Sequence, residues 1–409
     1  MREDKIFYQN KVKRIFYSIE FTNGFRRAAF GALILIYFLS LGHNLVNVTA
    51  LFAISSIILI LFEFPTGAIA DHYSRRLSVI ISFFLMGVSF LGIYLFKDFF
   101  LLGFFYILGD IAWTFQSGTS NAWAVDNLKY GKHKKNLAVL FSRFFFFEKI
   151  GNILGALVGI ILVSINFRFI WLAISLSNFI FTYVLIKYME DKNFNPKKSK
   201  YNFLKETLLK MKESIIYFFK KKNKTTRGLA LSLIFGVISV NSFYIIIPLV
   251  LKDKIGLLPY QISGIFFIIG VIVLIAPILG ERFSRKLGYR KTLTFGTLLY
   301  AISMLFFGLF YYFIFSLLTL ILVRFFLDGT DAIHESAVQH SIPSNCRATL
   351  GSAMSVMWGL SNAIAVYSSG LVISSYGLKF ATLISFIFAL ITSLIYFKIL
   401  KEKDEFKLS

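Results

Sequence analysis

The stretch LFEFPTGAIADHYSRRLSVI, Leu61 to Ile80, joins two apolar segments through a short hinge that carries Asp71, Arg75 and Arg76. About 20 apolar residues are enough for a helix to cross the roughly 30 Å hydrocarbon core of a bilayer. Because the hinge is so short, the two segments have to run antiparallel, with the charges left at one membrane face. The stretch therefore predicts a pair of membrane-spanning helices that turn back on one side.

The composition of the whole chain points to the same class of protein. Of its 409 residues, 57% are hydrophobic and 18% aromatic, and the mean hydropathy is +0.71. A soluble fold of this length could not bury so much apolar surface. The chain lacks the ten-residue alternation of an outer-membrane barrel, and its start is too polar for a signal peptide. We expect an all-α polytopic membrane protein.

Apolar runs between charged or Gly/Pro breaks predict twelve transmembrane helices. They lie at about residues 26–43, 48–70, 77–96, 100–124, 142–164, 168–187, 228–250, 260–280, 291–311, 313–338, 348–373 and 378–399. Most of the 44 basic residues then fall on the side of the two termini. The opposite side receives only Lys97, Arg168, Lys252, Lys254 and Lys379. The positive-inside rule predicts a protein of the cytoplasmic (inner) membrane with both termini in the cytoplasm.

The formal net charge of +23 follows largely from this topology. Anionic lipids of the cytoplasmic leaflet are the expected partner of the basic loops, and nucleic acid is a poor interpretation. Cys346 is the only cysteine, so an internal disulfide is excluded. A monomer is plausible.

The basic central segment divides the chain into an N-terminal six-helix half at 1–187, a cytoplasmic loop at 188–227 and a C-terminal six-helix half at 228–409. Apolar residues recur at helical spacing inside this loop, at Leu204, Leu208, Met211, Ile215 and Phe218. This pattern predicts a helix in the headgroup plane, and a solvated linker is the alternative. A similar pattern predicts a surface helix before the first span, at Val12, Ile15, Phe16 and Ile19.

An internal repeat supports two related halves. The stretch ADHYSRR, Ala70 to Arg76, matches GERFSRK, Gly280 to Lys286, in the order acid, aromatic residue, serine and two bases. Glu281 and Arg285 thus correspond to Asp71 and Arg75. Duplication of a six-span unit is the simplest explanation, because parallel repeats of this kind build some transporters.

Polar side chains form a second correspondence between the halves. In the fourth span Asp110, Thr114, Ser117 and Asn121 stand at i, i+4, i+7 and i+11, and in the tenth span Arg324, Asp328, Asp331 and Glu335 repeat that spacing. Such spacing places each set on one helix face. Asp110 and Arg324 each lie roughly 15 Å from the outer end, near the bilayer midplane. Charges at that depth have to face protein or water.

The hinge, the duplication and the twelve spans together resemble the major facilitator superfamily. Gly67, Asp71, Arg75 and Arg76 match its signature loop Gly-x-x-x-Asp-x-x-x-Arg-Arg/Lys, and the segments EFPTGAIAD and SGTSNAWAVDNLK look like those of a bacterial, efflux-type branch. The resemblance implies that the loop latches the two halves during alternating access. It also implies that the first, fourth, seventh and tenth helices line a central cavity.

Two departures bear on the efflux interpretation. The fourth span lacks the arginine often found in proton-coupled exporters, and Asp110 is its nearest deep charge. Gly151, Gly155 and Gly159 resemble an antiporter glycine motif without its proline, and close helix packing explains them equally well.

Physical chemistry gives the signature loop its own rationale. Gly67 would let neighbouring helices approach closely, and Asp71 would sit at the favourable N-terminus of the next helix. Arg75 and Arg76 would anchor at lipid phosphates. A plain topogenic turn is the alternative.

The candidate substrate or coupling site comprises Asp110, Thr114, Asn121, Arg324, Asp328, Asp331, His334 and Glu335. Asp328 is the expected partner of Arg324, and a purely structural ion pair is the alternative. Asp331, His334 and Glu335 have the chemistry of a proton relay, though a solvated cavity wall fits them as well. Metal binding is unsupported, since no second ligand cluster matches them.

The candidate cytoplasmic gate adds charges near the signature loop. Glu63 and Glu148 either carry protons or pair with Arg75, Arg143 or Arg347, and we favour the pairing. Asp126, which closes the fourth span, is expected in the same network.

No catalytic motif, P-loop or metal-ligand spacing occurs, so the sequence predicts a transporter and no enzyme. Without a nucleotide site, a proton gradient is the expected energy source, and no cofactor is needed. The leading hypothesis is proton-coupled export of a small amphipathic compound. Proton-coupled uptake of a metabolite is the first alternative, and a non-coupled lipid or sensor role is the second.

Overall fold

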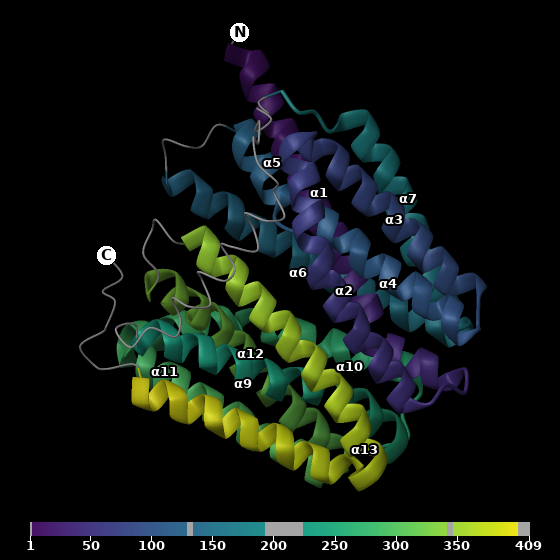
Figure 1. Cartoon of the computed structure of the whole chain (residues 1–409), viewed down its shortest axis with the longest axis vertical. Coiled ribbons are helices and arrows are strands. Elements are labelled where there is room, and N and C mark those ends of the chain that lie inside the picture. The colour runs from purple at the N-terminus through teal and green to yellow at the C-terminus, as the bar shows by residue number, and fades with distance from the viewer. Residues whose placement is uncertain (1, 129–133, 193–223, 342–346, 400–409) are drawn as a thin grey trace. The chain divides into compact units, whose positions relative to one another are not determined.

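The computed structural model describes residues 2–128, 134–192, 224–341 and 347–399, and all its regular elements there are helices (Figure 1). The predicted all-α fold is confirmed. The helices are α1 (Arg2–Ser40), α2 (Leu45–His72), α3 (Arg75–Leu95), α4 (Phe99–Gln116), α5 (Thr119–Leu128), α6 (Lys134–Ile165), α7 (Phe169–Tyr188), α9 (Lys224–Leu249), η2 (Val250–Lys254), α10 (Pro259–Ile272), η3 (Val273–Ile275), α11 (Ala276–Leu309), α12 (Phe313–Ser341) and α13 (Arg347–Ile399).

Two glycines divide the longest helical stretches into separate crossings. Nine helical stretches of the described chain are long and apolar enough to span a membrane, and Pro259–Leu309 and Ala353–Ile399 are 51 and 47 residues long. One crossing needs about 20. Each long stretch contains a glycine with non-helical backbone angles, Gly288 (φ 80°, ψ 160°) and Gly377 (φ 81°, ψ 173°). Each therefore makes two crossings, and the apolar end of α1 completes the twelve predicted spans.

The turns before α3 and α4 each end on a residue that caps the helix N-terminus. Ser74 Oγ accepts a hydrogen bond from the backbone N–H of Leu77 at 3.0 Å, and Asp98 Oδ1 accepts from Phe100 and Leu101 at 3.0 Å each. These contacts satisfy N–H groups that have no partner within the helix. The caps fix where α3 and α4 begin.

The chain folds into two compact units. Unit 1 comprises Met1–Tyr37, Ile58–Lys205 and Pro259–Phe267, and unit 2 comprises Phe38–Ile57, Glu206–Leu258 and Ile268–Ser409. In unit 2 the first part of α2 packs on α13, where Asn362 Nδ2 donates to Ser56 Oγ at 2.9 Å. The proposed boundaries at 187 and 228 stay a prediction, and the amphipathic helix expected at 204–218 lies outside the described residues.

The segment before the first span is part of the helical core. Val12, Ile15, Phe16 and Ile19 are at most 7% exposed and belong to a buried cluster. Their partners there are Val79, Phe83, Trp123, Ala124, Leu128, Leu140, Phe144, Phe181, Leu185 and Met189. The predicted surface helix is wrong, because α1 continues through this region and buries its apolar face inside unit 1. Helical spacing of apolar residues does not distinguish protein from lipid headgroups as the covering layer.

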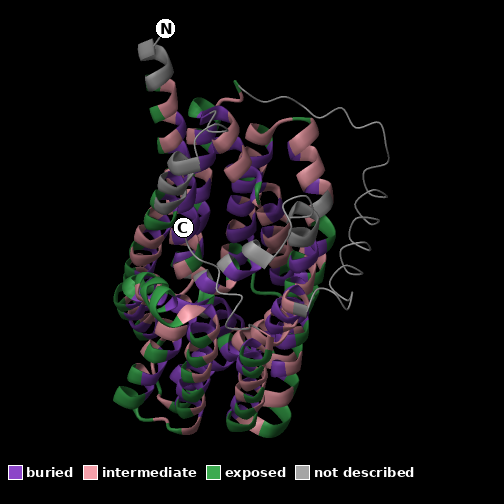
Figure 2. Cartoon of the chain, turned by 90° about the vertical axis from the view of Figure 1, so that its left-hand side faces the viewer, coloured by how far each residue is buried: buried purple, intermediate pink, exposed green. Residues whose placement is uncertain are grey.

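Exposed positions lie along the helices (green in Figure 2), and many of these exposed side chains are apolar. On α4, Phe100 and Phe104 are 82% and 60% exposed, while Leu102 between them is fully buried. In water such a surface would be unfavourable, but lipid tails are as apolar as the side chains themselves. This burial pattern fits a protein surrounded by hydrocarbon.

Glycines let α1 and α6 cross with their backbones in contact. A methyl group at Gly151 or Gly155 would come within 2.1 Å of the carbonyl oxygen of Phe21 or within 2.2 Å of that of Phe25. A methyl group at Gly24 would lie 2.1 Å from the carbonyl oxygen of Glu148. The packing explanation of the predicted glycine motif therefore accounts for Gly151 and Gly155.

The close helix approach expected at Gly67 occurs instead at Gly280, which corresponds to Ala70 in the repeat. A methyl group at Gly67 would meet no described atom within 4 Å, whereas one at Gly280 would lie 2.2 Å from the carbonyl oxygen of Gly329 on α12. The prediction for Gly67 is therefore wrong in this structure. Contacts of this kind depend on both helices, and the sequence of one hinge carries no information on its neighbour.

Replacing Gly155 with alanine tests the crossing of α1 and α6. Because the new methyl group would overlap a backbone oxygen, the two helices have to separate, and we expect a loss of about 2 kcal/mol in stability. Thermal unfolding of the purified protein in detergent measures this. Gly31→Ala on α1 is the matched control, since no described atom lies within 4 Å of the new methyl position. Equal melting temperatures for the two variants would refute the crossing.

Candidate functional site

Unit 2 contains a pocket of about 370 Å³ that α9, α11, α12 and α13 line. Its titratable lining is Asp331, His334 and Glu335, all from α12. Its aromatic lining is Tyr244, Tyr300, Trp358 and Tyr396, which come from the other three helices and face the same space. The three residues predicted as a proton relay are thus brought together at one pocket, and α12 is a continuous helix through all of them.

Arg324 lies near this pocket with its charge compensated. Its Nη2 is 3.1 Å from Asp328 Oδ1, so the predicted i+4 ion pair is confirmed. Its Nη1 also donates to the hydroxyl of Tyr244, a residue of the pocket wall. The guanidinium is thereby fixed between α12 and α9.

His334 has one ring nitrogen engaged and one open. Its Nδ1 shares a hydrogen bond of 2.8 Å with the hydroxyl of Tyr396. Its Nε2 is buried and has no hydrogen-bond partner among the described residues. A buried polar atom of this kind costs free energy unless some group satisfies it.

The polar stripe predicted on the fourth span is interrupted. The chain leaves the helix at Ser117, Gly118 takes φ 68°, and α5 begins at Thr119. Asp110 and Thr114 therefore lie on α4 and Asn121 on α5, so the single helix face predicted for them is wrong. The Thr114 hydroxyl donates to the carbonyl of Ile111 at 2.7 Å, and Asn121 Oδ1 is buried without a described hydrogen-bond donor.

Unit 1 contains a second charged cluster that the sequence analysis did not identify. Arg27 Nη1 lies 2.9 Å from Glu148 Oε1, and its Nη2 lies 3.7 Å from Glu20 Oε2. Asn23 donates to Glu20 at 3.1 Å. Arg26 lies in the electrostatic field of Asp110 and Glu20. Glu148 therefore pairs with α1, and not with the Arg75 or Arg143 partners that we predicted.

An aromatic ring holds the two arginines of this cluster in place. The guanidinium carbons of Arg26 and Arg27 lie 5.3 Å and 5.7 Å from the ring centroid of Trp113 on α4. Cations at this distance are attracted to the electron-rich face of an indole. The sequence does contain a signal for this cluster, the adjacent pair Arg26 and Arg27 at the start of the first apolar run. The positive-inside rule interprets such a pair only as basic residues that flank a span.

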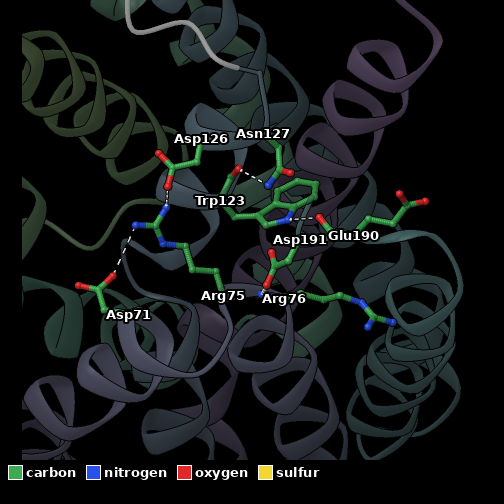
Figure 3. A network of polar contacts seen from close by, with 8 residues as sticks. All are labelled: Asp71, Arg75, Arg76, Trp123, Asp126, Asn127, Glu190 and Asp191. Carbon is green, nitrogen blue, oxygen red and sulfur yellow. Dashed lines mark hydrogen bonds and ion pairs between the residues drawn. The ribbon is translucent and has the colours of Figure 1, made fainter. Parts of the chain in front are cut away.

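Arg75 is the centre of the signature-loop network (Figure 3). It pairs with Asp126 of α5 and, at 3.5 Å, with Asp71 of α2. Asp126 thus contacts Arg75, one of the bases expected in the gate, and its membership of a gate stays a prediction. Arg76 contacts α7 instead, because its Nη2 donates to the carbonyl of Ile186 at 2.6 Å.

Asp191 takes the position at the N-terminus of α3 that we predicted for Asp71. Its Oδ2 accepts a hydrogen bond from Ser74 Oγ at 2.7 Å. The same oxygen accepts from the backbone N–H of Arg76 at 3.1 Å (Figure 3). Asp71 lies in the last turn of α2, so its predicted role at a helix N-terminus is wrong. An anion at this place is favoured by the free N–H groups and the dipole of α3. Asp71 is next to the hinge in the sequence, whereas Asp191 is 115 residues from Arg76. Only the fold brings Asp191 to the cap.

The segment after α7 ties three helices together. Trp123 of α5 donates its indole N–H to the carbonyl of Glu190 at 2.8 Å. The Glu190 carboxylate binds Lys11 of α1 and Lys192, the latter at 3.0 Å. The hydrogen bond from Lys11, followed by that from Lys192, lowers the pKa of Glu190 below its ordinary value.

The other predicted gate residues have separate surroundings. Glu63 accepts a hydrogen bond from Ser117 at 3.3 Å, Arg143 is exposed on α6, and Glu281 pairs with Arg285 one turn along α11. The side chain of Arg347 lies outside the described residues. Among those that the structure describes, no three His, Cys, Asp or Glu side chains gather closely enough to hold a metal ion.

Comparison with known proteins identifies the family. The profile of the Major Facilitator Superfamily matches residues 16–365 and 229–408. The chain belongs to this superfamily. No curated protein matches it at a significant level. The superfamily consists of transporters, so this chain is a multi-pass membrane transporter of the secondary type, which binds small-molecule substrates, and no enzyme.

Solved structures agree with the major facilitator fold. The nucleoside transporter NupG has a TM-score of 0.76 at 13% identity, covering 95% of this chain and 100% of that one. A D-xylose-proton symporter has a TM-score of 0.73 at 15% identity, covering 97% and 99%. A bacterial homolog of the human lysosomal transporter Spinster has a TM-score of 0.77 at 12% identity, covering 95% and 96%. At these identities the likeness establishes the fold.

Replacing Arg27 with methionine tests the cluster in unit 1. Because the carboxylates of Glu20 and Glu148 are only 5% and 11% exposed, loss of their counter-ion should cost about 2 kcal/mol of stability. The double variant Arg27→Met, Glu148→Met should recover part of this loss, because it removes one stranded charge. Thermal unfolding measures both, with Arg14→Met at an exposed position of α1 as the control. The pairing would be contradicted if the double variant lost as much stability as Arg27→Met and Glu148→Met lose separately, added together.

The lowered pKa of Glu190 predicts a pH dependence of stability. The ionised carboxylate contributes stability above the pKa of the unfolded chain, near 4.5, and that stability is lost as the pH falls through the folded pKa. Thermal unfolding at pH 7 and at about pH 3 should show a larger drop for the wild type than for Glu190→Gln. The same drop in both proteins would mean that the ion pairs contribute nothing.

Proposed function

We propose that this chain is a proton-coupled secondary transporter of the cytoplasmic membrane, which moves a small organic compound by alternating access of a central site. In this proposal both termini and the basic loops face the cytoplasm, where anionic lipids surround the loops. The positive-inside distribution of lysine and arginine supports this orientation.

The pocket on α12 is the observation that carries the proposal. It has a volume of about 370 Å³, within the range usual for small-molecule sites, and is lined by Asp331, His334 and Glu335. Carboxylates and a histidine in a membrane-spanning helix are costly to maintain and mark substrate or proton pathways. A transporter that uses a proton gradient needs such groups beside its substrate.

Comparable depth of the main charges supports one substrate or coupling site shared by both halves. Asp110 comes eleven residues after Phe99, the first residue of α4, and Arg324 comes eleven residues after Phe313, the first residue of α12. At about 1.5 Å per residue each lies roughly 16 Å along its helix, near the centre of a bilayer. In our proposal Asp110, Arg324 and Asp328 take part in coupling, with Thr114 and Asn121 contributing polar contacts.

The signature-loop network is the proposed cytoplasmic latch. Arg75 binds acids of both α2 and α5, so its release would free these helices to move. Asp71, Asp126 and Arg76 belong to this latch in our proposal. Gly67, Glu63, Arg143, Glu148, Glu281, Arg285 and Arg347 stay candidates for the gate.

For direction, we propose export of a small amphipathic compound. The resemblance of the Glu-Phe-Pro-Thr-Gly segment supports export, but helix packing accounts for Gly151 and Gly155 without an antiporter role. Uptake of a metabolite is the second candidate, and one similar fold, that of a D-xylose-proton symporter, favours it. Oriented vesicles with a proton gradient imposed in either sense separate the two directions.

Neutralising the two deep charges tests coupling. We expect Asp110→Asn and Arg324→Ala each to reduce proton-driven flux in proteoliposomes by at least about tenfold, because a missing charge leaves its partner unbalanced near the midplane. Flux of radiolabelled candidate compounds is measured with and without a pH gradient. Asp253→Asn, an exposed acid of η2 outside the pocket, is the control.

If both variants retain flux and its pH dependence, the coupled-site proposal is wrong. A non-coupled lipid or sensor role on the same fold would then be the better interpretation. Folding of each variant is checked by its melting temperature, so that loss of flux is not mistaken for loss of protein.

A further inference from the structure

Unit 2 contains a second cavity, a groove of about 200 Å³ between α11 and α12. It shares only Thr330 with the pocket described above. Four apolar side chains of its wall are 43–57% exposed, and they are Phe283, Leu287, Phe295 and Leu299, all of α11. In a membrane-spanning chain such side chains face lipid tails. The groove therefore opens on the hydrocarbon side of unit 2.

The interior of this groove suits hydrocarbon. A methyl group at Gly296 would lie 2.4 Å from Cγ2 of Thr330, so the glycine keeps the floor low. The hydroxyl of Thr292 donates to the carbonyl of Gly288 at 2.9 Å, and that of Thr330 donates to the carbonyl of Phe326 at 2.9 Å. Both hydroxyl protons are thus used inside their own helices. Among the described lining residues, only Lys291 is left as a side-chain donor.

The groove spans about the depth of one lipid leaflet. It begins at the turn, where Leu287 and Lys291 lie on either side of Gly288, and it reaches Ala276 and Leu299. Ala276 comes eleven residues before Leu287, and Leu299 comes eight after Lys291. At about 1.5 Å per residue these lengths are roughly 16 Å and 12 Å. Half of a hydrocarbon core of roughly 30 Å is about 15 Å, so one acyl chain that enters at the turn can follow the groove to the bilayer centre.

Bases without a described counter-charge lie at the turn end of the groove. Residues 281–291 contain one acid, Glu281, and five bases, which are Arg282, Arg285, Lys286, Arg290 and Lys291. Arg285 pairs with Glu281. Arg282, Lys286 and Lys291 are exposed, and the structure records no ion pair for them among the described residues. An anionic headgroup at this end would therefore be attracted.

This charge also decides between two kinds of apolar occupant. A second copy of the chain, docked about a two-fold axis along the membrane normal, would bring its own turn with the same bases against this one. Like charges repel, so self-association at the groove is unfavourable. An anionic lipid brings the opposite charge and a chain of matching length.

We propose that the groove binds one anionic phospholipid of the cytoplasmic leaflet. An acyl chain lies against Phe283, Phe295 and Leu299, and the phosphate lies at Lys291. This is one specific site on unit 2, distinct from the general attraction of lipids to basic loops. It rests on the orientation in the proposed function, which places this turn at the cytoplasmic face, and it does not require transport.

Lipid binding to the full-length protein in detergent tests the inference. Phosphatidylglycerol and phosphatidylcholine with identical acyl chains are titrated, and native mass spectrometry gives the dissociation constant of the first bound lipid. We expect the wild type to prefer phosphatidylglycerol by at least about fivefold. Lys291→Gln should weaken phosphatidylglycerol binding by about fivefold and leave phosphatidylcholine binding unchanged, because it removes one attractive charge near the phosphate.

A second variant tests the chain-binding part of the groove without any change of charge. Leu299→Trp places a larger side chain where the acyl chain lies, so it should weaken both lipids by at least about tenfold through lost methylene contacts. Leu322→Trp on α12 is its matched control, since Leu322 is 44% exposed, Leu299 is 43% exposed, and only Leu299 lines the groove. Lys254→Gln is the control for charge, at an exposed position of η2 outside the groove. Both controls should bind like the wild type.

Four results would overturn the inference. They are equal affinity of the wild type for the two lipids, unchanged affinity in the folded groove variants, displacement of the lipid by millimolar inorganic phosphate, and a dimer that the groove variants abolish. The first two would remove the site, the third would make it a site for free anions, and the fourth would assign the groove to a second copy.

Lipid binding and flux fail independently. A protein that binds phosphatidylglycerol through Lys291 but shows no gradient-driven flux keeps the lipid site and loses the transport function. A protein with proton-driven flux and no lipid preference keeps the transport function and loses the lipid site.

Discussion

A charge inside a membrane-spanning helix bundle has to find a counter-charge or water within the protein, because lipid offers neither. This constraint accounts for the side-chain arrangement in both units. Arg27 lies between Glu148 and Glu20, and Arg324 lies beside Asp328 and Tyr244. Such pairs are costly to bury and add little net stability by themselves. Their presence in so apolar a chain is explained better by a task that needs charge than by folding.

The sequence predicts these pairs only where they are local. The spacing of Arg324 and Asp328 is that of neighbours on one helix, so their contact could be predicted. The partner of Glu148 lies on α1, 121 residues earlier, and sequence spacing has no bearing on it. The same limit explains Asp71 and Asp191, since the acid that binds the N-terminus of α3 arrives from the far end of α7.

Backbone breaks limit the sequence argument in another way. The predicted fourth span has a continuous polar pattern through Ser117 and Asn121, and nothing in that periodicity signals a turn. Gly118 with φ 68° ends α4, and the register of α5 is then independent of α4. By contrast, no such glycine conformation interrupts α12, and the polar face predicted there is present. The twelve spans were predictable because length and hydropathy are local properties, and the kinks at Gly288 and Gly377 fall between the predicted crossings.

The two units treat their charges differently, and this bears on coupling. In unit 1 the guanidinium groups of Arg26 and Arg27 lie against the ring of Trp113, and Glu20, Asp110 and Glu148 are the acids that interact with them. On α12, Arg324 is paired with Asp328 and donates to the hydroxyl of Tyr244. Protonation of a carboxylate in either cluster would remove its charge, and this would lower the cost of exposing the cluster to a less polar environment. A cluster that can change its charge in this way is a sufficient basis for coupling a proton to a change of conformation, because the two charge states differ in which environment they favour.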